Sequence, residues 1–158
     1  MSGRIVVGVD GSEGSLRALQ WAIEDAGFRD AAVQAVTVWR GTEIDDDMAL
    51  EWATLPSLAR LDRASAEQAG QRLRQAVAEV LADRPVRVDP IVVEGDPAEA
   101  LCRRAAGADL LVVGSRGHGV VAGLLIGSVS LKCARHSPCP VAIVAVDQET
   151  AAPATRAR

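Results

Sequence analysis

The chain alternates between short, continuous apolar runs and longer stretches in which apolar residues recur three or four positions apart. Short apolar runs bounded by turn residues predict buried strands, and the wider spacing predicts helices. Predicted strands cover residues 4–9, 32–39, 86–94, 109–113 and 141–146. Predicted helices cover residues 16–27, 57–83, 96–107 and 128–136. This alternation of strands and helices predicts an α/β fold: a single, doubly wound parallel sheet with helices on both faces.

Composition agrees with a buried sheet. Hydrophobic residues make up 49% of the 158 residues but aromatic residues only 3%, so aliphatic side chains must fill the core. Such a composition is typical of parallel strands that are covered on both faces. We expect one domain over residues 1–147, followed by a flexible tail over 148–158 that is polar and rich in alanine.

Charge and hydropathy exclude several classes of function. The net charge of -4 argues against nucleic-acid binding, which needs a basic surface. No apolar stretch reaches the roughly 18 residues that a membrane-spanning helix requires, and the first residues lead directly into a strand pattern without the layout of a signal peptide. We therefore expect a cytoplasmic protein without nucleic-acid or membrane partners.

The cysteines do not indicate a disulfide framework, because there are three of them. Cys102 lies in a helical pattern and is expected to be a small core residue. Cys133, His136 and Cys139 are spaced like metal ligands, but a closed zinc site needs four ligands and no fourth stands nearby. A metal site is therefore not expected at these residues.

Two glycine-rich turns follow predicted strands, one over residues 10–15 and one that begins at Gly114 and leads into the helix at Ser128. Glycine lets a ligand approach backbone N–H groups closely, and a helix start attracts anions. Ligands of doubly wound sheets bind at the carboxyl ends of the strands, where the strand order reverses. If the first and fourth strands are neighbours there, the two turns form one phosphate-binding crevice. The alternative is that the second turn is a flexible connection that holds no ligand.

Two familiar phosphate-binding motifs are missing. The P-loop requires G-x-x-x-x-G-K-[ST], whereas the single lysine of this chain is Lys132, inside a predicted helix. The dinucleotide fingerprint requires G-x-G-x-x-G after the first strand, and the glycines there have the wrong spacing.

The motif Gly114-x2-Gly117-x9-Gly127-Ser128 resembles the nucleotide-binding signature of the universal stress protein family. The segments 5–12 and 137–144 resemble the two ends of that family, so the resemblance covers the chain from Ile5 to about Val146. It implies the ATP-binding type of this family and a five-stranded sheet of order 3-2-1-4-5. It also implies a homodimer paired along strand 141–146, with further protein partners unknown.

The resemblance also implies roles for individual residues. Gly114, Gly117, Gly127, Ser128 and Val129 would hold the phosphates and ribose, and Val38 would meet adenine through its backbone. Asp10 would contact the ribose and phosphates or Mg²⁺, with Gly11 and Ser12 beside it. The candidate set is completed by Ser115, Arg116, His118, Gly119 and Ser130.

Some of these roles have alternatives. Asp10 is the carboxylate expected to bind Mg²⁺, which favours one or two carboxylates plus phosphate oxygens; alternatively it caps the first helix. Arg116 pairs with a phosphate or is a solvated loop residue. Ser128 and Ser130 donate hydroxyls to phosphate or serve in capping and solvation. His118 is expected to be a surface loop residue.

Three functions are open from the sequence. The first is an ATP-binding regulatory protein of a stress response. The second is an ATPase. Its hydrolysis of ATP would be slow, because no residue set resembles a catalytic triad or the lysine clamp of phosphoryl transfer. The third is a dimeric interaction scaffold that binds no nucleotide.

Overall fold

The computed structural model describes residues 3–41, 56–117 and 126–146. In chain order the elements are β1 (Gly3–Gly8), α1 (Glu13–Arg29), β2 (Ala31–Trp39), α3 (Pro56–Leu81), β3 (Val88–Glu94), α4 (Pro97–Ala105), β4 (Leu110–Gly114), α5 (Ser128–His136) and β5 (Val141–Val144). The predicted alternation is confirmed, with element ends that differ by a few residues. The predicted tail lies outside the described residues.

The strands form one parallel sheet in the order β3-β2-β1-β4-β5, which confirms the predicted fold. β1 lies in the middle, where Val7 pairs with Ala35 of β2 on one side and with Val112 of β4 on the other. The chain moves outward from β1 to β3, and returns to the other side of β1 with β4. The strand order therefore reverses between β1 and β4, and the carboxyl ends of these two strands are neighbours.

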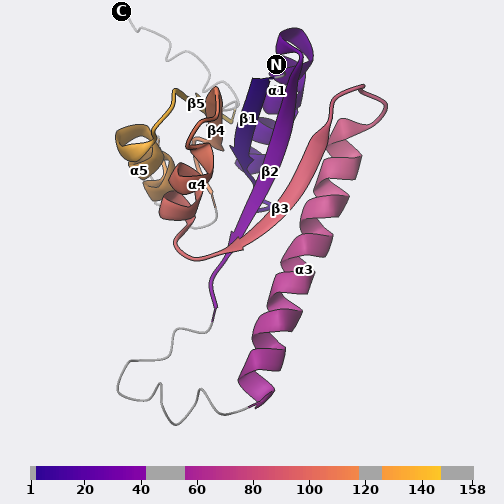
Figure 1. The fold of residues 1–158 in the computed structure, drawn as a ribbon, viewed down its shortest axis with the longest axis vertical. Helices are drawn as coiled ribbons and strands as arrows, with labels where there is room; N and C mark the ends of the chain where they lie inside the picture. The colour runs from indigo at the N-terminus through magenta and orange to yellow at the C-terminus, as the bar shows by residue number, and fades with distance from the viewer. Residues whose placement is uncertain (1–2, 42–55, 118–125, 147–158) are drawn as a thin grey trace, which may run out of the picture.

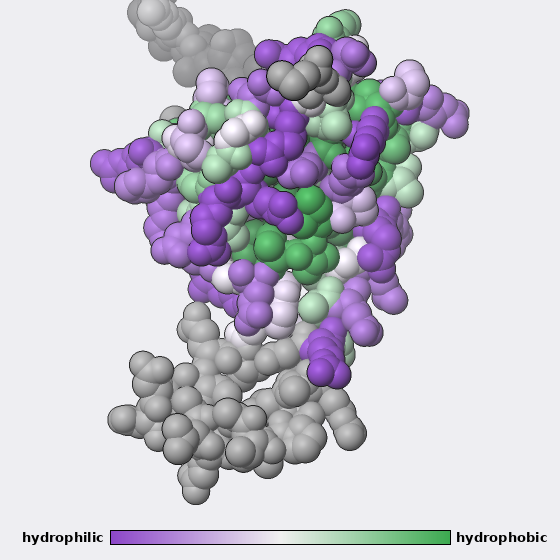
Figure 2. Space-filling view, viewed as in Figure 1, coloured by the Kyte–Doolittle hydropathy of each residue, from purple (hydrophilic) through white to green (hydrophobic). Residues whose placement is uncertain are grey.

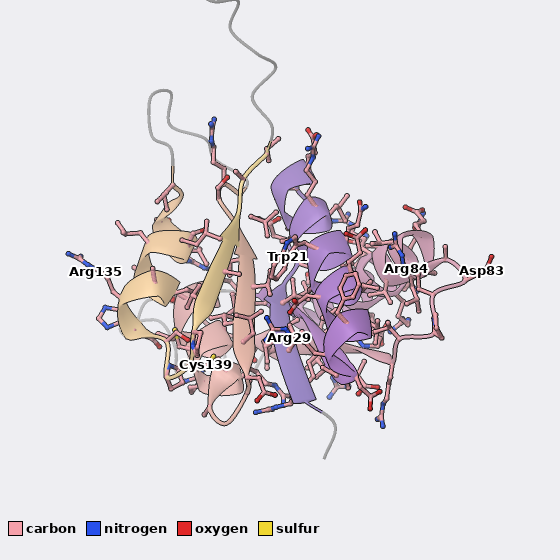
Figure 3. The ribbon with its side chains drawn as sticks, turned by 90° about the horizontal axis from the view of Figure 1, so that it is seen from above. Trp21, Arg29, Asp83, Arg84, Arg135 and Cys139 are labelled. Atoms are coloured by element: carbon pink, nitrogen blue, oxygen red, sulfur yellow. The ribbon has the colours of Figure 1, made fainter. Side chains whose placement is uncertain are left out.

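Helices cover both faces of the sheet, α1 and α3 on one face and α4 and α5 on the other (Figures 1 and 3). Ile5 and Val7 pack into the core under α1 and α3, whereas Val6 between them packs into the core under α4 and α5. All three side chains are fully buried. Burial on both faces explains why β1 appears in the sequence as an unbroken apolar run.

The face under α4 and α5 is covered less completely. Val38, Ile91 and Val93 at the β2–β3 side are only partly buried, and hydrophobic surface gathers in the middle of this view of the molecule (Figure 2). On the opposite face, Trp21 and Phe28 of α1 are exposed. Within the described ranges, none of the helices combines the length and apolarity that crossing a bilayer requires.

Candidate functional site

A cavity of about 480 Å³ opens at the carboxyl end of the sheet. Its walls come from the carboxyl-terminal parts of β1, β2 and β4, from α4, and from the first turns of α1 and α5. Its volume lies within the range of roughly 300–1,000 Å³ that is common for small-molecule sites. It occupies the point of strand reversal, where doubly wound sheets bind their ligands.

The two glycine-containing turns meet at this cavity. A Cβ atom on Gly114 would lie 2.7 Å from the backbone carbon of Gly14. A Cβ on Gly14 would lie 2.7 Å from the backbone oxygen of Arg116. The end of β4 and the start of α1 therefore touch backbone to backbone, a contact that only residues without side chains permit.

Asp10 organises the first turn. Its Oδ1 accepts hydrogen bonds from the backbone N–H of Ser12, at 2.9 Å, and from the Ser12 hydroxyl. Ser12 in turn caps α1, because its Oγ accepts from the N–H of Ser15 at 3.3 Å. The interpretation of Asp10 as the cap of this helix is therefore wrong. The Asp10 carboxylate instead lines the cavity, and a Cβ on Gly117 would lie 2.5 Å from its Oδ2.

α5 begins at the cavity without a side-chain cap. Its N-cap residue is Gly127, and no side chain accepts a hydrogen bond there. By contrast, the N-cap of α4 is Asp96, whose Oδ1 accepts from the N–H groups of Ala98 and Glu99 at 3.1 Å each. The first N–H groups of any helix lack partners within the helix. The first turn of α5 therefore offers donors and a positive dipole end to a ligand.

Two further hydrogen bonds fix α5 to the end of β4. The Gly127 N–H donates to the backbone oxygen of Ser115 at 2.6 Å, and the buried Ser130 hydroxyl donates to the backbone oxygen of Gly114 at 2.5 Å. The Ser130 hydroxyl thus has a backbone partner and anchors the helix. Ser115 is buried, and its backbone N–H donates to the backbone oxygen of Val144 at 2.8 Å.

The charged side chains in the described lining are one carboxylate, Asp10, and two guanidinium groups, Arg40 and Arg116. The Nε atom of Arg116 is buried and has no hydrogen-bond acceptor in the described part of the chain. A buried donor without an acceptor is costly. An anion in the cavity would supply one.

Arg40 lies 3.6 Å from Asp96, measured from Nη2 to Oδ2. The pKa of Asp96 lies below its ordinary value, chiefly because the Glu99 N–H donates to the carboxylate. The positive charges of Lys132 and Arg40 and the N–H of Ala98 act in the same direction, and partial burial opposes them. Asp96 is therefore ionised at neutral pH, and its carboxylate is an ion-pair partner for Arg40 at the cavity wall.

The structure brings most of the predicted site residues into this lining: Asp10, Val38, Gly114, Arg116, Gly117, Gly127, Ser128, Val129 and Ser130. Gly11, Ser12 and Ser115 are not among the lining residues. His118 and Gly119 lie outside the described residues. Cys133, His136 and Cys139 do not come together as a group that could hold a metal ion in the described part of the chain.

Sequence reasoning missed one wall of the cavity and several strand ends. The missed residues are Gly8, Val9, Ser15, Val36, Arg40, Pro97, Leu101, Val113 and Ile126. A usable signal existed for Pro97, because Asp96-Pro97 starts a helix directly after a predicted strand, as the other two turns do. No local motif marks Arg40 or Leu101.

Comparison with known proteins gives a consistent result. The family model described as the universal stress protein family matches residues 1–145. Universal stress protein Rv2623 of Mycobacterium tuberculosis is 32% identical over 144 residues, which cover 88% of this chain and 44% of that protein. The chain spans about half the length of the curated relatives that it matches.

Solved structures also match. A universal stress protein in complex with cAMP is 30% identical, with a TM-score of 0.65, and the match covers 90% of this chain and 96% of the other. The universal stress protein UspA from Lactobacillus plantarum has a TM-score of 0.74 at 23% identity, covering 90% of this chain and 97% of that one. The second likeness bears on the fold alone.

Proposed function

The chain belongs to the universal stress protein family, and we propose that it binds ATP with Mg²⁺ in this cavity as a regulatory protein of a stress response. The observation that carries the proposal is the start of α5, where Gly127 leaves the first turn without a side-chain cap at the cavity wall. A similar protein was solved in complex with cAMP, which supports an adenine nucleotide as the ligand.

The phosphates would lie between the start of α5 and the second glycine turn. Backbone N–H groups there and the Arg116 guanidinium supply donors to an anion. Gly117 leaves the necessary room, because a Cβ would occupy the space beside Asp10. Ser128 is exposed at the helix start, and its hydroxyl would add a donor.

The base would lie against the apolar part of the cavity. Val38, Leu101 and Val129 line it there, and apolar side chains suit the face of an aromatic ring. We propose that the backbone of Val38, at the end of β2, meets the edge of adenine. Arg40, two residues further on, would lie close to the same end of the ligand.

Asp10 fits the role of the Mg²⁺ ligand. It is the single carboxylate in the described lining, and one carboxylate together with phosphate oxygens is a common arrangement for this ion. Bound Mg²⁺ would offset phosphate charge that two guanidinium groups and one helix dipole leave uncompensated.

The lining favours binding over catalysis. Among the described lining residues there is neither histidine nor lysine, and the single acid is the proposed Mg²⁺ ligand. Phosphoryl transfer needs groups that position the attacking water and stabilise the developing charge. We therefore propose that any hydrolysis of ATP is slow and that occupancy of the cavity is the signal.

We further propose a homodimer that pairs through β5. β5 is the last strand of the sheet order, next to β4, and all four of its residues are partly exposed. An apolar edge strand is prone to pair with another strand, and a second copy would provide one. Sedimentation as a monomer at micromolar concentration would contradict this.

The cytoplasmic location is part of the proposal, and cell fractionation tests it.

The decisive binding experiment compares Gly117→Val with Gly27→Val by calorimetry. Valine at position 117 intrudes on Asp10 and the phosphate space, so ATP affinity should fall at least about tenfold, or about 1.4 kcal/mol. Gly27 lies on α1 away from the cavity, and its Cβ would meet Val86 at 3.7 Å, so affinity should not change. Unaltered ATP affinity in folded Gly117→Val refutes the proposed site.

Two controls separate the parts of the ligand. Arg116→Gln should weaken ATP by about 1.5–3 kcal/mol, the range for a charged hydrogen bond, and should leave adenosine binding unchanged. Asp10→Asn should remove the difference in ATP affinity between Mg²⁺ and a chelator. Equal affinity in both conditions for the unaltered protein would contradict the Mg²⁺ role.

A further inference from the structure

The two arginines of the cavity lining follow two different strands. Arg40 follows β2 and Arg116 follows β4, and β1 lies between these strands in the sheet. Neighbouring strands are about 4.8 Å apart, so the ends of β2 and β4 are separated by roughly 10 Å. The proposed function places the phosphates at Arg116 and the start of α5. Arg40 then lies at the end of the cavity that is left for the base.

Arg40 is also the polar end of an apolar wall. Val36 and Val38 of β2 belong to the face of the sheet that α4 covers, and Arg40 forms its ion pair with Asp96 at the start of α4, on the same face. Exposure rises along this row: Val36 is 1% exposed, Val38 is partly buried, and the side chain of Arg40 is 60% exposed. Leu101 of α4 lines the same part of the cavity. A flat ring between Val38 and Leu101 would therefore have its outer edge beside Arg40.

The ion pair decides which kind of group suits this end of the cavity. The Oδ2 of Asp96 lies 3.6 Å from Nη2 of Arg40, and its Oδ1 is engaged with two N–H groups of α4 at 3.1 Å each. An anion that approached Arg40 would therefore also approach a carboxylate that is anchored to α4, and like charges repel. A neutral hydrogen-bond acceptor meets no such repulsion.

Arg40 has donors to offer to such an acceptor. A guanidinium group carries five N–H donors in a planar fork, and the ion pair with Asp96 involves one of its nitrogen atoms. A hydrogen bond from an ionised donor is stronger than one between two neutral groups. The edges of nucleobases carry acceptors of the required kind.

We propose that Arg40 is a specificity-determining residue, whose guanidinium donates a hydrogen bond to the outer edge of a purine base and so selects purine over pyrimidine nucleotides. This inference rests on the nucleotide binding proposed above. A purine is joined to ribose through its five-membered ring, so its six-membered ring extends further from the ribose than a pyrimidine does. With ribose and phosphates in the same place, a pyrimidine leaves Arg40 without its acceptor.

The test measures the affinities for ATP and CTP by calorimetry, with Mg²⁺ and 0.15 M salt, for the parent chain, Arg40→Met and Arg87→Met. Arg87 is the matched control, because it is an exposed arginine that pairs with Asp89 at 3.2 Å and precedes β3, at the opposite end of the sheet. Arg40→Met should weaken ATP about tenfold, the lower end of the range for a hydrogen bond to a charged group, and should leave CTP nearly unchanged. Arg87→Met should alter neither affinity.

The ratio of the two affinities separates base recognition from a general effect of charge. ATP and CTP carry the same triphosphate, so the loss of a positive charge alone would weaken both equally. At this salt concentration charges are screened over about 8 Å, which is less than the separation of the two strand ends. A parent chain that binds ATP and CTP equally, or an unchanged ratio in Arg40→Met, would overturn the role of Arg40 and leave the ATP site standing. A parent chain that binds neither nucleotide would overturn both proposals.

Discussion

Replacing Gly114 with alanine tests whether the two turns at the cavity are held together by close backbone contact. Gly114 is the last residue of β4, and a Cβ there would lie 2.7 and 2.8 Å from the backbone carbon and oxygen of Gly14 and 3.1 Å from the backbone nitrogen of Ser15. Ordinary van der Waals contact begins near 3.4 Å. The new methyl group is therefore too close to three backbone atoms at once.

The surroundings leave little room to relieve this contact. Gly114 pairs with Val144 of β5, and its carbonyl accepts the Ser130 hydroxyl, so β4 cannot move freely. The start of α1 is equally fixed, because Ser15, Ala18 and Leu19 are buried. A backbone neighbour cannot rotate away as a side chain can. We therefore expect a loss of about 1–3 kcal/mol of unfolding free energy, the usual cost of overpacking.

The assay is urea unfolding of Gly114→Ala beside Gly27→Ala. Gly27 lies within α1 and its Cβ would be in ordinary contact with Val86, so alanine there should stabilise the protein by about 0.5–1 kcal/mol through helix propensity. The two variants should thus shift the urea midpoint in opposite directions. A Gly114→Ala variant as stable as the parent chain would refute the close contact between β4 and α1.

Two further predictions concern single hydrogen bonds near the cavity. Asp96→Ala should lower the free energy of unfolding by about 1 kcal/mol at neutral pH, a typical N-cap contribution. Because the pKa of Asp96 is lowered in the folded chain, this contribution is complete above about pH 4 and disappears as the pH falls through the pKa of the folded state. The unfolding free energies of the parent chain and the variant, measured in urea, should therefore converge in acid. Ser130→Ala should lower the free energy of unfolding by about 1 kcal/mol, because the hydrogen bond to Gly114 is lost. Ser128→Ala, at an exposed position, should change it by no more than about 0.5 kcal/mol. Equal unfolding free energies for the two serine variants would contradict the anchoring role of Ser130.

Much of the site could be predicted because it depends on local features of the chain. A glycine turn after a strand and a helix that starts with Gly127-Ser128 are visible in the sequence, and they mark where backbone donors become available. The details of hydrogen bonding were not visible. The cap of α1 is Ser12 rather than Asp10, because the Ser12 Oγ accepts from the N–H of Ser15 in the first turn, whereas the Asp10 Oδ1 accepts from the N–H of Ser12, before the helix begins.

The sequence by itself determined the order and type of the elements, since the apolar spacing of a strand or helix repeats within a few residues along the chain. Only the tertiary structure decided which elements lie together around the cavity and in the core. It places Arg40 of the β2 end and Leu101 of α4 at the cavity, and it packs Cys102 and Cys133 into the same apolar core. These contacts depend on how each crossover returns the chain to the sheet, and that geometry leaves no short-range pattern in the sequence.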